Sequence, residues 1–215
     1  EPVDILRGSS VSGKGKTIFQ RNMVIIQFSI SIMLIISLLT VHKQMHYIRN
    51  QSLGFDEENI VLVSAPSQQM TEHYEAFRNE LLKNPQILSL ARASDVPGET
   101  FFSTTGFAPK LNPEETISML ILGIDHDFIP TYEMKLLEGR NFSRTIASDT
   151  SGTLVLNKAA VRRIGWKPDE AVGKELKYGL NAPSRKIIGV VDDFHLKSLH
   201  TMVEPMALIL NPEWF

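Results

Sequence analysis

An uncharged run near the N-terminus constrains the fold of this chain more than any other feature. Residues 23–41, "MVIIQFSISIMLIISLLTV", carry no charged side chain. A helix of about 20 apolar residues crosses the hydrocarbon core of a bilayer. The few polar side chains, such as Gln27 and Ser31, do not gather on one face as they would in the amphipathic helix of a soluble protein. We therefore predict a transmembrane helix over residues 23–41 and the lipid bilayer as its partner.

Two other interpretations of this run fit less well. A buried core helix of a soluble protein usually carries a polar stripe, which is missing here. A cleaved signal peptide has an apolar region of about 7–15 residues that ends at small residues. The sequence that follows the run, "HKQMHYIRN", offers no such cleavage site.

The segment before the run, "GSSVSGKGKT" at residues 8–17, is similar to a phosphate-binding P-loop. Neither register is complete. A loop that starts at Gly8 has Gly15 where a hydroxyl should hold Mg²⁺, and a loop that starts at Ser10 lacks the opening glycine. A P-loop also opens a helix of a soluble α/β domain rather than a membrane helix. Nucleotide binding here is the weaker hypothesis.

We interpret residues 1–22 as a cytoplasmic juxtamembrane linker. Its Lys14 and Lys16 would lie near anionic lipid headgroups, where each basic side chain adds about 1 kcal/mol of attraction. The excess of basic residues before the run over those directly after it slightly favours a cytoplasmic N-terminus.

The helical pattern continues beyond the uncharged run. Val41, Met45 and Ile48 keep an apolar spacing of four and then three residues, which is typical of one helix face. Gly54, followed by acidic residues, is a helix stop signal. The sequence therefore predicts a stalk helix over residues 42–54.

The remaining residues, 55–215, predict one extracytoplasmic domain of the α+β class with two β-α-β-like halves and antiparallel pairing. Residues 96–116 and 143–153 are rich in glycine, proline or small polar side chains. They predict a loop with short extended pieces and a mobile surface loop, respectively. Expected strands are 59–65, 87–94, 117–125, 154–157, 185–194 and 206–211, and expected helices are 71–85, a short one within 126–139, 158–165 and a turn near 167–176.

Charge and cysteine content exclude several classes of site. The chain has 22 Lys and Arg against 24 Asp and Glu, for a net charge of −2. A nucleic-acid-binding surface needs a basic patch, so we predict no nucleic-acid partner. The chain contains no cysteine, which excludes disulfides and thiolate metal sites within it.

Four side chains near the C-terminus are the strongest candidates for chemistry. "DDFHLKSLH" brings together Asp192, Asp193, His195 and His200 at the end of an apolar strand. The two carboxylates could bind a cation with His195, or they could cap the turn that follows. Caps are far commoner than metal sites, so we favour the structural role.

A second pair of histidines lies in the stalk. His42 and His46 are one helical turn apart and could share a metal, but a closed site needs further ligands that the sequence does not supply on this face. The chain also lacks the Ser-x-Gly nucleophile elbow, the HExxH zinc motif and the dinucleotide glycine fingerprint. We predict no catalytic residue, no metal-binding residue, no cofactor and no enzymatic activity of its own.

The order of several short motifs resembles a known family. "RNMVIIQFSISIMLIISLLTVHKQMHYIRNQSLGFDEENIVLV" is followed by "LLEGRNFS", "LVLNKAAVRRIGW", "EAVGKEL" and "IIGVVDDFHLKSLHTMVEP". In this order they resemble the MacB-like periplasmic core domain of FtsX-like ABC transporter permeases, over nearly the whole chain.

The resemblance implies a permease segment in the cell inner membrane, with residues 42–215 in the periplasm. ATP hydrolysis is then expected in a separate ABC ATPase subunit, and other envelope proteins or a second permease half are further candidate partners. The family has additional membrane helices, so we expect this sequence to be an excerpt of a longer chain. Gly54 and Pro97-Gly98 are candidate flexible points or ordinary turns.

Two alternatives from other functional classes stay open. The same layout of anchor and domain suits the ligand-sensing domain of a membrane receptor. A membrane-tethered hydrolase would need a pocket that joins Asp192, Asp193 and His195 to a substrate.

Overall fold

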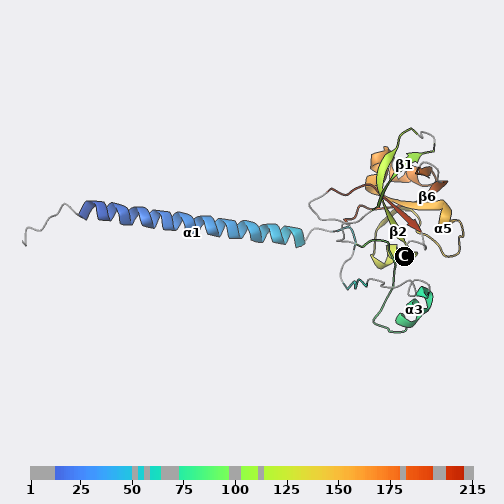
Figure 1. Ribbon diagram of the computed structural model, residues 1–215, viewed down its shortest axis with the longest axis horizontal. Helices are drawn as coiled ribbons and strands as arrows, with labels where there is room; N and C mark the ends of the chain where they lie inside the picture. The colour runs from blue at the N-terminus through green and yellow to red at the C-terminus, as the bar shows by residue number, and fades with distance from the viewer. Residues whose placement is uncertain are drawn as a thin grey trace, which may run out of the picture. The chain divides into compact units, whose positions relative to one another are not determined.

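The computed structural model describes residues 13–49, 53–55, 59–63, 73–96, 103–110, 114–179, 183–195 and 202–210 (Figure 1). The chain forms two compact units, Glu1–Gln51 and Ser52–Phe215, and each is described by itself.

The first unit is built on one long helix, α1 (Gly13–Arg49). Within Thr17–Ile48, an 18-residue window has a mean hydropathy of 2.5, and none of that window is buried inside the protein. The helix is therefore long and apolar enough to cross a membrane, as predicted. It starts ahead of residue 23, so the backbone of the basic segment around Lys16 is helical. Helical structure also continues past Val41, as the stalk prediction requires, and residues 50–52 lie outside the described range.

The second unit is built on one mixed sheet in the order β3-β6-β4-β7-β2-β1-β5. The last strand of this order, β5, also pairs with β6, which is the second strand of the order. The pairs β2–β7 and β4–β6 are parallel, and the other pairs are antiparallel. The strands are β1 (Ser103–Pro109), β2 (Ile117–Ile124), β3 (Leu136–Gly139), β4 (Thr153–Asn157), β5 (Glu175–Tyr178), β6 (Ser184–Val191) and β7 (Met206–Leu210).

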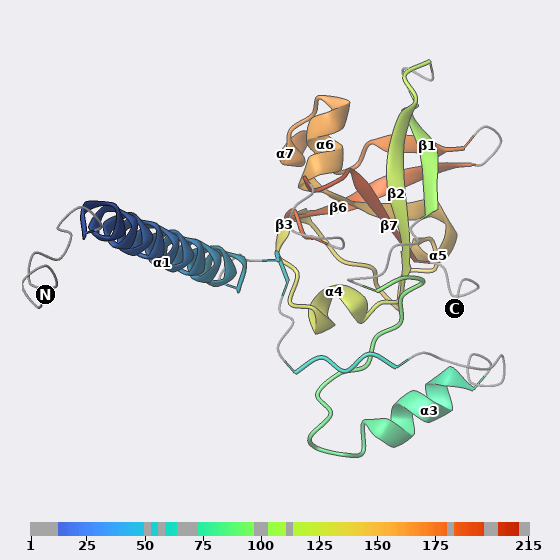
Figure 2. The same ribbon diagram turned by 60° about the vertical axis from the view of Figure 1, so that its left-hand side comes forward.

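Both faces of the central strands are buried, which explains their continuous apolar sequences. Side chains alternate between the faces with a period of two. On β2, Leu120 and Leu122 join a cluster with α4 (Phe128–Thr131), whereas Met119 and Ile121 join a second cluster. The second cluster packs against α6 (Lys158–Ile164) and α7 (Pro168–Ala171). Figure 2 shows α6 and α7 together beside the strands, with α4 elsewhere on the domain.

Asn157 connects three elements at the end of β4. Its side chain is fully buried, and its Oδ1 accepts hydrogen bonds from the backbone N–H groups of Ala160 and Met206, each at 2.9 Å. Its Nδ2 donates to the carbonyl oxygen of Glu204 at 2.9 Å. One amide therefore caps the start of α6 and fixes the start of β7 beside it.

The mixed α+β class is confirmed, and so are the strands predicted within 117–125, 154–157, 185–194 and 206–211. The helix predicted over 158–165 is confirmed as α6, and the helix within 71–85 is confirmed as α3 (Tyr74–Leu81). In the second half of the domain, β4 and β6 are parallel neighbours joined through α6 and α7, as a β-α-β-like unit requires.

The first β-α-β-like half is not formed as predicted. Residues 59–63 belong to no strand, and Val61 and Val63 are 83% and 71% exposed. Within 87–94 there is only an isolated bridge from Ala93 to Ile124. A run of β-branched residues predicts an extended backbone, but a strand forms only where that backbone hydrogen-bonds to a neighbouring strand. A short run does not indicate which strand that neighbour would be.

Two further assignments are wrong in detail. The helix placed within 126–139 ends at Thr131, where Glu133 has a φ of +48° that no α-helix continues through, and β3 follows it. Residues 103–109, which were placed in a loop with short extended pieces, form the full strand β1 in spite of Gly106 and Pro109. Antiparallel pairing with β2 and β5 outweighs these local preferences.

Replacing Asn157 by Ala should lower the free energy of unfolding by about 2–4 kcal/mol, because it removes a helix cap and leaves buried backbone groups unpaired. The measurement is denaturant unfolding of the detergent-solubilised chain, followed by tryptophan fluorescence. Lys177→Ala on the exposed side of β5 is the control and should change stability by less than about 0.5 kcal/mol. Equal stability of the two variants would contradict the role given to Asn157.

Candidate functional site

The first described residues of the second unit pack closely against the end of β6. The backbone N–H of His195 donates to the carbonyl oxygen of Leu53 at 2.8 Å. The ring of Phe55 meets that of Tyr132 edge to face, with centroids 5.4 Å apart, and packs against the core. We call Leu53–Phe55 together with Asp193–His195 the entry joint. It is the place where the chain that follows α1 in sequence enters the domain.

Gly54 is the tightest point of the entry joint. Its φ is +85°, a conformation that side chains other than glycine rarely adopt. A Cβ built there would lie 2.7 Å from the Cα of Phe194 and would overlap the carbonyl oxygen of Asp193. Of the two roles expected for Gly54, the close turn therefore fits this geometry and the flexible point does not. The other candidate, Pro97-Gly98, lies outside the described residues.

The acidic pair Asp192 and Asp193, of which Asp193 belongs to the entry joint, lies at the start of α6. Asp193 accepts a hydrogen bond from the backbone N–H of Ala159 at 2.6 Å, and its other oxygen lies 3.7 Å from the guanidinium of Arg162. Asp192 accepts from the N–H of Asp193 and lies 3.6 Å from the ammonium of Lys158. A carboxylate at this end of α6 satisfies a free N–H and complements the helix dipole.

The capping role favoured from the sequence therefore fits the observed geometry, but the capped segment is the start of α6 rather than the turn after Asp193. His195 contributes its backbone N–H to the entry joint, and His200 lies outside the described residues. The side chains of His42 and His46 are exposed on α1. Over the described part of the chain, no three His, Cys, Asp or Glu side chains are placed to hold a metal ion together.

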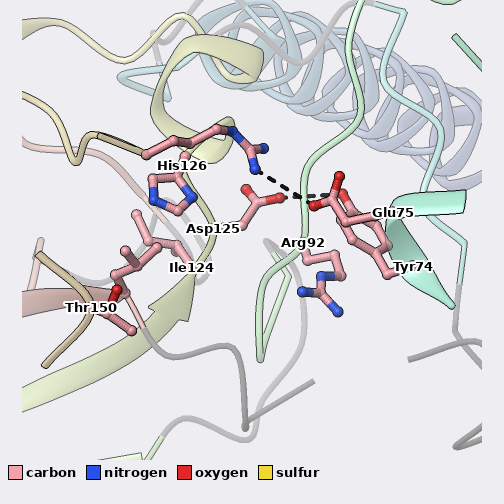
Figure 3. Close-up of a pocket in the computed structure, with 9 residues that line it drawn as sticks. Tyr74, Glu75, Arg92, Ile124, Asp125, His126 and Thr150 are labelled. Atoms are coloured by element: carbon pink, nitrogen blue, oxygen red, sulfur yellow. Dashed lines mark hydrogen bonds and ion pairs between the residues drawn. The ribbon is translucent and has the colours of Figure 1, made fainter. Parts of the chain in front are cut away.

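A small pocket of about 140 Å³ lies at the end of β2, beside α3 (Figure 3). The hydroxyl of Tyr74 donates to a carboxylate oxygen of Asp125 at 3.2 Å, and the guanidinium of Arg92 lies 3.8 Å from the centre of the Tyr74 ring. Burial raises the pKa of both Tyr74 and Asp125. The pocket is lined by Tyr74, Glu75, Arg92, Ile124, Asp125, His126, Arg144, Thr150 and Leu210.

The charges beside this pocket are paired with one another. Asp127 accepts from Arg78 at 2.9 Å and from Arg144 at 2.7 Å, and Arg144 also lies 3.5 Å from Glu75. Burial, followed by the nearby guanidinium of Arg144, lowers the pKa of His126. These contacts fasten separate segments to one another rather than presenting free groups to a substrate. Sequence reasoning missed this cluster, because its members come from three distant stretches and follow no motif.

The polar segment at 143–153 is held in place by an ion pair between the buried Asp149 and the partly exposed Arg140. Asp149 is fully buried and accepts two hydrogen bonds from the guanidinium of Arg140, at 2.6 and 2.8 Å, and one from the N–H of Ser143 at 2.9 Å. Hydrogen bonding by Arg140 is the main cause that lowers the pKa of Asp149. The segment contains the short helix α5 (Asp149–Gly152), which was not predicted, and residues 144–148 before it form an exposed loop, as expected. The mobility of this loop stays a prediction.

Comparison with known proteins places the chain in a family. The family model described as the MacB-like periplasmic core domain matches residues 24–209. The chain belongs to the MacB-like periplasmic core domain family. This confirms the resemblance, carried by the ordered motifs, to the periplasmic core domain of ABC-type permeases.

Solved structures with a related fold are distant. The periplasmic region of MacB from Actinobacillus actinomycetemcomitans is 19% identical, with 63% of this chain and 54% of that chain covered and a TM-score of 0.43. A domain of a putative permease protein from Porphyromonas gingivalis is 19% identical, with 59% and 52% covered and a TM-score of 0.41. The extracellular domain of the noncanonic ABC-type transporter YknZ from Gram-positive bacteria is 13% identical, with 67% and 68% covered and a TM-score of 0.43.

The chain thus spans about half the length of the first two of these structures. No curated protein sequence matches it significantly.

The ion pair between Arg140 and the buried Asp149 predicts an acid-sensitive stability. The pKa of Asp149 is lowered in the folded protein. Its contribution to the free energy of unfolding is therefore fully present above the ordinary pKa of about 3.9 and is lost as the pH falls through the lower pKa of the folded state. Asp149→Asn should cost about 2 kcal/mol at neutral pH and should make stability less dependent on pH below about 5.

The test is denaturant unfolding of wild type and variant between pH 7 and about pH 2. Glu138→Gln, which changes an exposed carboxylate on β3, is the control and should keep the wild-type pH profile. If the wild type and Asp149→Asn lose stability in parallel on acidification, the pair does not carry this dependence.

Proposed function

We propose that this chain is the part of an ABC-type permease that transmits motion of a membrane helix to a periplasmic domain. In this proposal α1 spans the cell inner membrane, residues 42–215 are periplasmic, and a separate ABC ATPase subunit supplies the energy. The system would serve export or mechanical signalling across the envelope. Other envelope proteins or a second permease half would be further partners.

The observation that carries the proposal is the entry joint. A displacement can pass from a helix to a domain only if the connection resists bending, and the packing around Gly54 leaves no room for the backbone to shift toward Asp193. The hydrogen bond between His195 and Leu53 adds a second constraint at the same place. Through Asp193, the joint is connected to the first turn of α6.

The helix itself supports the same role. Helical structure continues from Val41 to Arg49, which is about 12 Å at 1.5 Å per residue. A continuous helix is stiff over this length, so movement of the apolar part would reach the end of the helix with little loss. No solute has to pass through the chain for this mechanism, and no nucleotide site is required in it.

The alternative of a ligand-sensing receptor domain has less support. A sensor needs a pocket with groups free to bind a ligand, whereas the charged groups beside the pocket already pair with one another. Membership of a permease family also favours the transporter proposal over the receptor.

The experiment follows the height of the domain above the bilayer. Because the chain has no native cysteine, a single donor dye can be attached at Lys177→Cys, on the exposed side of β5. The full-length permease and its ATPase are reconstituted in nanodiscs that carry acceptor dyes on lipid headgroups. Energy transfer is compared between the nucleotide-free and vanadate-trapped states.

We expect a nucleotide-dependent change in energy transfer that Gly54→Ala reduces at least threefold. Gly165→Ala is the matched control, because Gly165 has nearly the same φ, +87°, but nothing within 4 Å of the added Cβ. An unchanged signal in the wild type, with the ATPase active, would contradict the proposed function. Equal changes in both glycine variants would contradict the role of the entry joint but not the proposed function as a whole.

A further inference from the structure

Helix α3 lies to one side of the strands in both Figure 1 and Figure 2. Tyr74 is its one buried residue, at the first position of the helix, and Phe77 is 37% exposed. Over the described residues, α3 therefore buries little apolar surface against the rest of the domain. A helix of this length needs packing or polar contacts to stay in place, since isolated short helices are marginal in water.

Polar contacts supply that attachment at two neighbouring carboxylates. Asp125 accepts the hydroxyl of Tyr74, and Asp127 accepts the guanidinium of Arg78. Both acids lie just after the end of β2, so they hold the first and second turns of α3 against the same edge of the domain.

Arg144 joins these contacts from a third segment. Its guanidinium lies 2.7 Å from Asp127 and 3.5 Å from Glu75, so it contacts both the sheet end and α3. The side chain of Arg144 is 45% exposed. Its partner Asp127 is 26% exposed, whereas Asp149 is fully buried, so salt and water reach both members of this ion pair.

The chain returns from α3 to the sheet at a well-defined place. Ser94 donates its N–H to the carbonyl oxygen of Gly123 at 2.8 Å, and Asp125 donates its N–H to the carbonyl oxygen of Arg92 at 3.1 Å. The hydroxyl of Ser94 also accepts the N–H of Gly123. These backbone contacts stay intact if α3 moves, because none of them involves the helix.

We propose that α3 is a flap, held closed over the end of β2 by an electrostatic latch centred on Arg144, and that it opens while the sheet stays folded. Residues 92–94 form the fixed base of the flap. Opening uncovers the pocket, whose floor includes the apolar side chains of Ile124 and Leu210. The flap is independent of the entry joint, so the proposal goes beyond the transmission of motion through Gly54.

Latch strength is the property that decides whether the flap opens. Pairs at half-exposed positions weaken as ionic strength rises, because the Debye length falls from about 10 Å at 0.1 M to about 3 Å at 1 M. The apolar core of the sheet does not depend on such pairs. Higher salt should therefore open α3 selectively.

The test is hydrogen–deuterium exchange of the whole chain in nanodiscs, read by mass spectrometry. The reporter amides are those of α3 and its C-cap, including the N–H of Leu82, which donates to Arg78. The reference amides belong to β4 and β7, which lie in the middle of the sheet order. Wild type is compared with Arg144→Gln at low and high sodium chloride.

We expect Arg144→Gln to exchange at least tenfold faster than wild type at α3, with β4 and β7 unchanged, and to lose most of the salt dependence. Arg144→Lys, which keeps the charge, should restore part of the protection. Lys83→Gln is the matched control. It removes the ion pair between Lys83 and Glu80 of α3, and this ion pair does not reach the sheet. It should leave exchange at α3 within about twofold of wild type.

Three results would overturn the flap. One is equal acceleration at α3, β4 and β7, because the latch would then hold the whole fold. Another is no acceleration at α3 in Arg144→Gln. The third is an equal effect of Arg144→Gln and Lys83→Gln, which would mean that loss of any charge on or near α3 is sufficient.

Discussion

The close approach of Gly54 to the backbone of Asp193 and Phe194 is the constraint on which the functional account depends. It fixes where the chain enters the domain, and the hydrogen bond from His195 to Leu53 fixes the direction of that entry. Asp193 extends the connection to α6, and Asn157 extends it further to β7. A short series of hydrogen bonds, in which the side chains of Asp193 and Asn157 accept backbone N–H groups, therefore links the domain entrance to the middle of the sheet.

The central strands and the apolar helix could be predicted because each is a continuous apolar stretch of sequence. The run at residues 23–41 has no charge, and β2, β4, β6 and β7 are apolar over most of their length because both faces are covered. Peripheral strands such as β3 were assigned to a helical region or were missed. Their residues are half exposed, and their structure depends on pairing with β6, which local sequence does not reveal.

The polar attachments were harder to predict than the core. Asp192 and Asp193 stand next to each other and were found, although the helix they cap precedes them in the chain. The contacts of Asp127 with Arg78 and Arg144 span large separations in sequence, and no spacing rule indicates them. Family membership makes the chain part of a permease, while the joint and the flap are features that only the folded geometry brings together.

The rigidity of the entry joint is tested most directly by the exchange rate of one amide, the N–H of His195, in the full chain in nanodiscs. NMR of the deuterated, ¹⁵N-labelled protein resolves single amides. If the joint is rigid, this amide should exchange as slowly as that of Ile187 on β6, which donates to Lys174 within the core of the domain. Exchange of the His195 amide at the rate of an unprotected peptide would contradict the account, because the entrance of the domain would then bend freely.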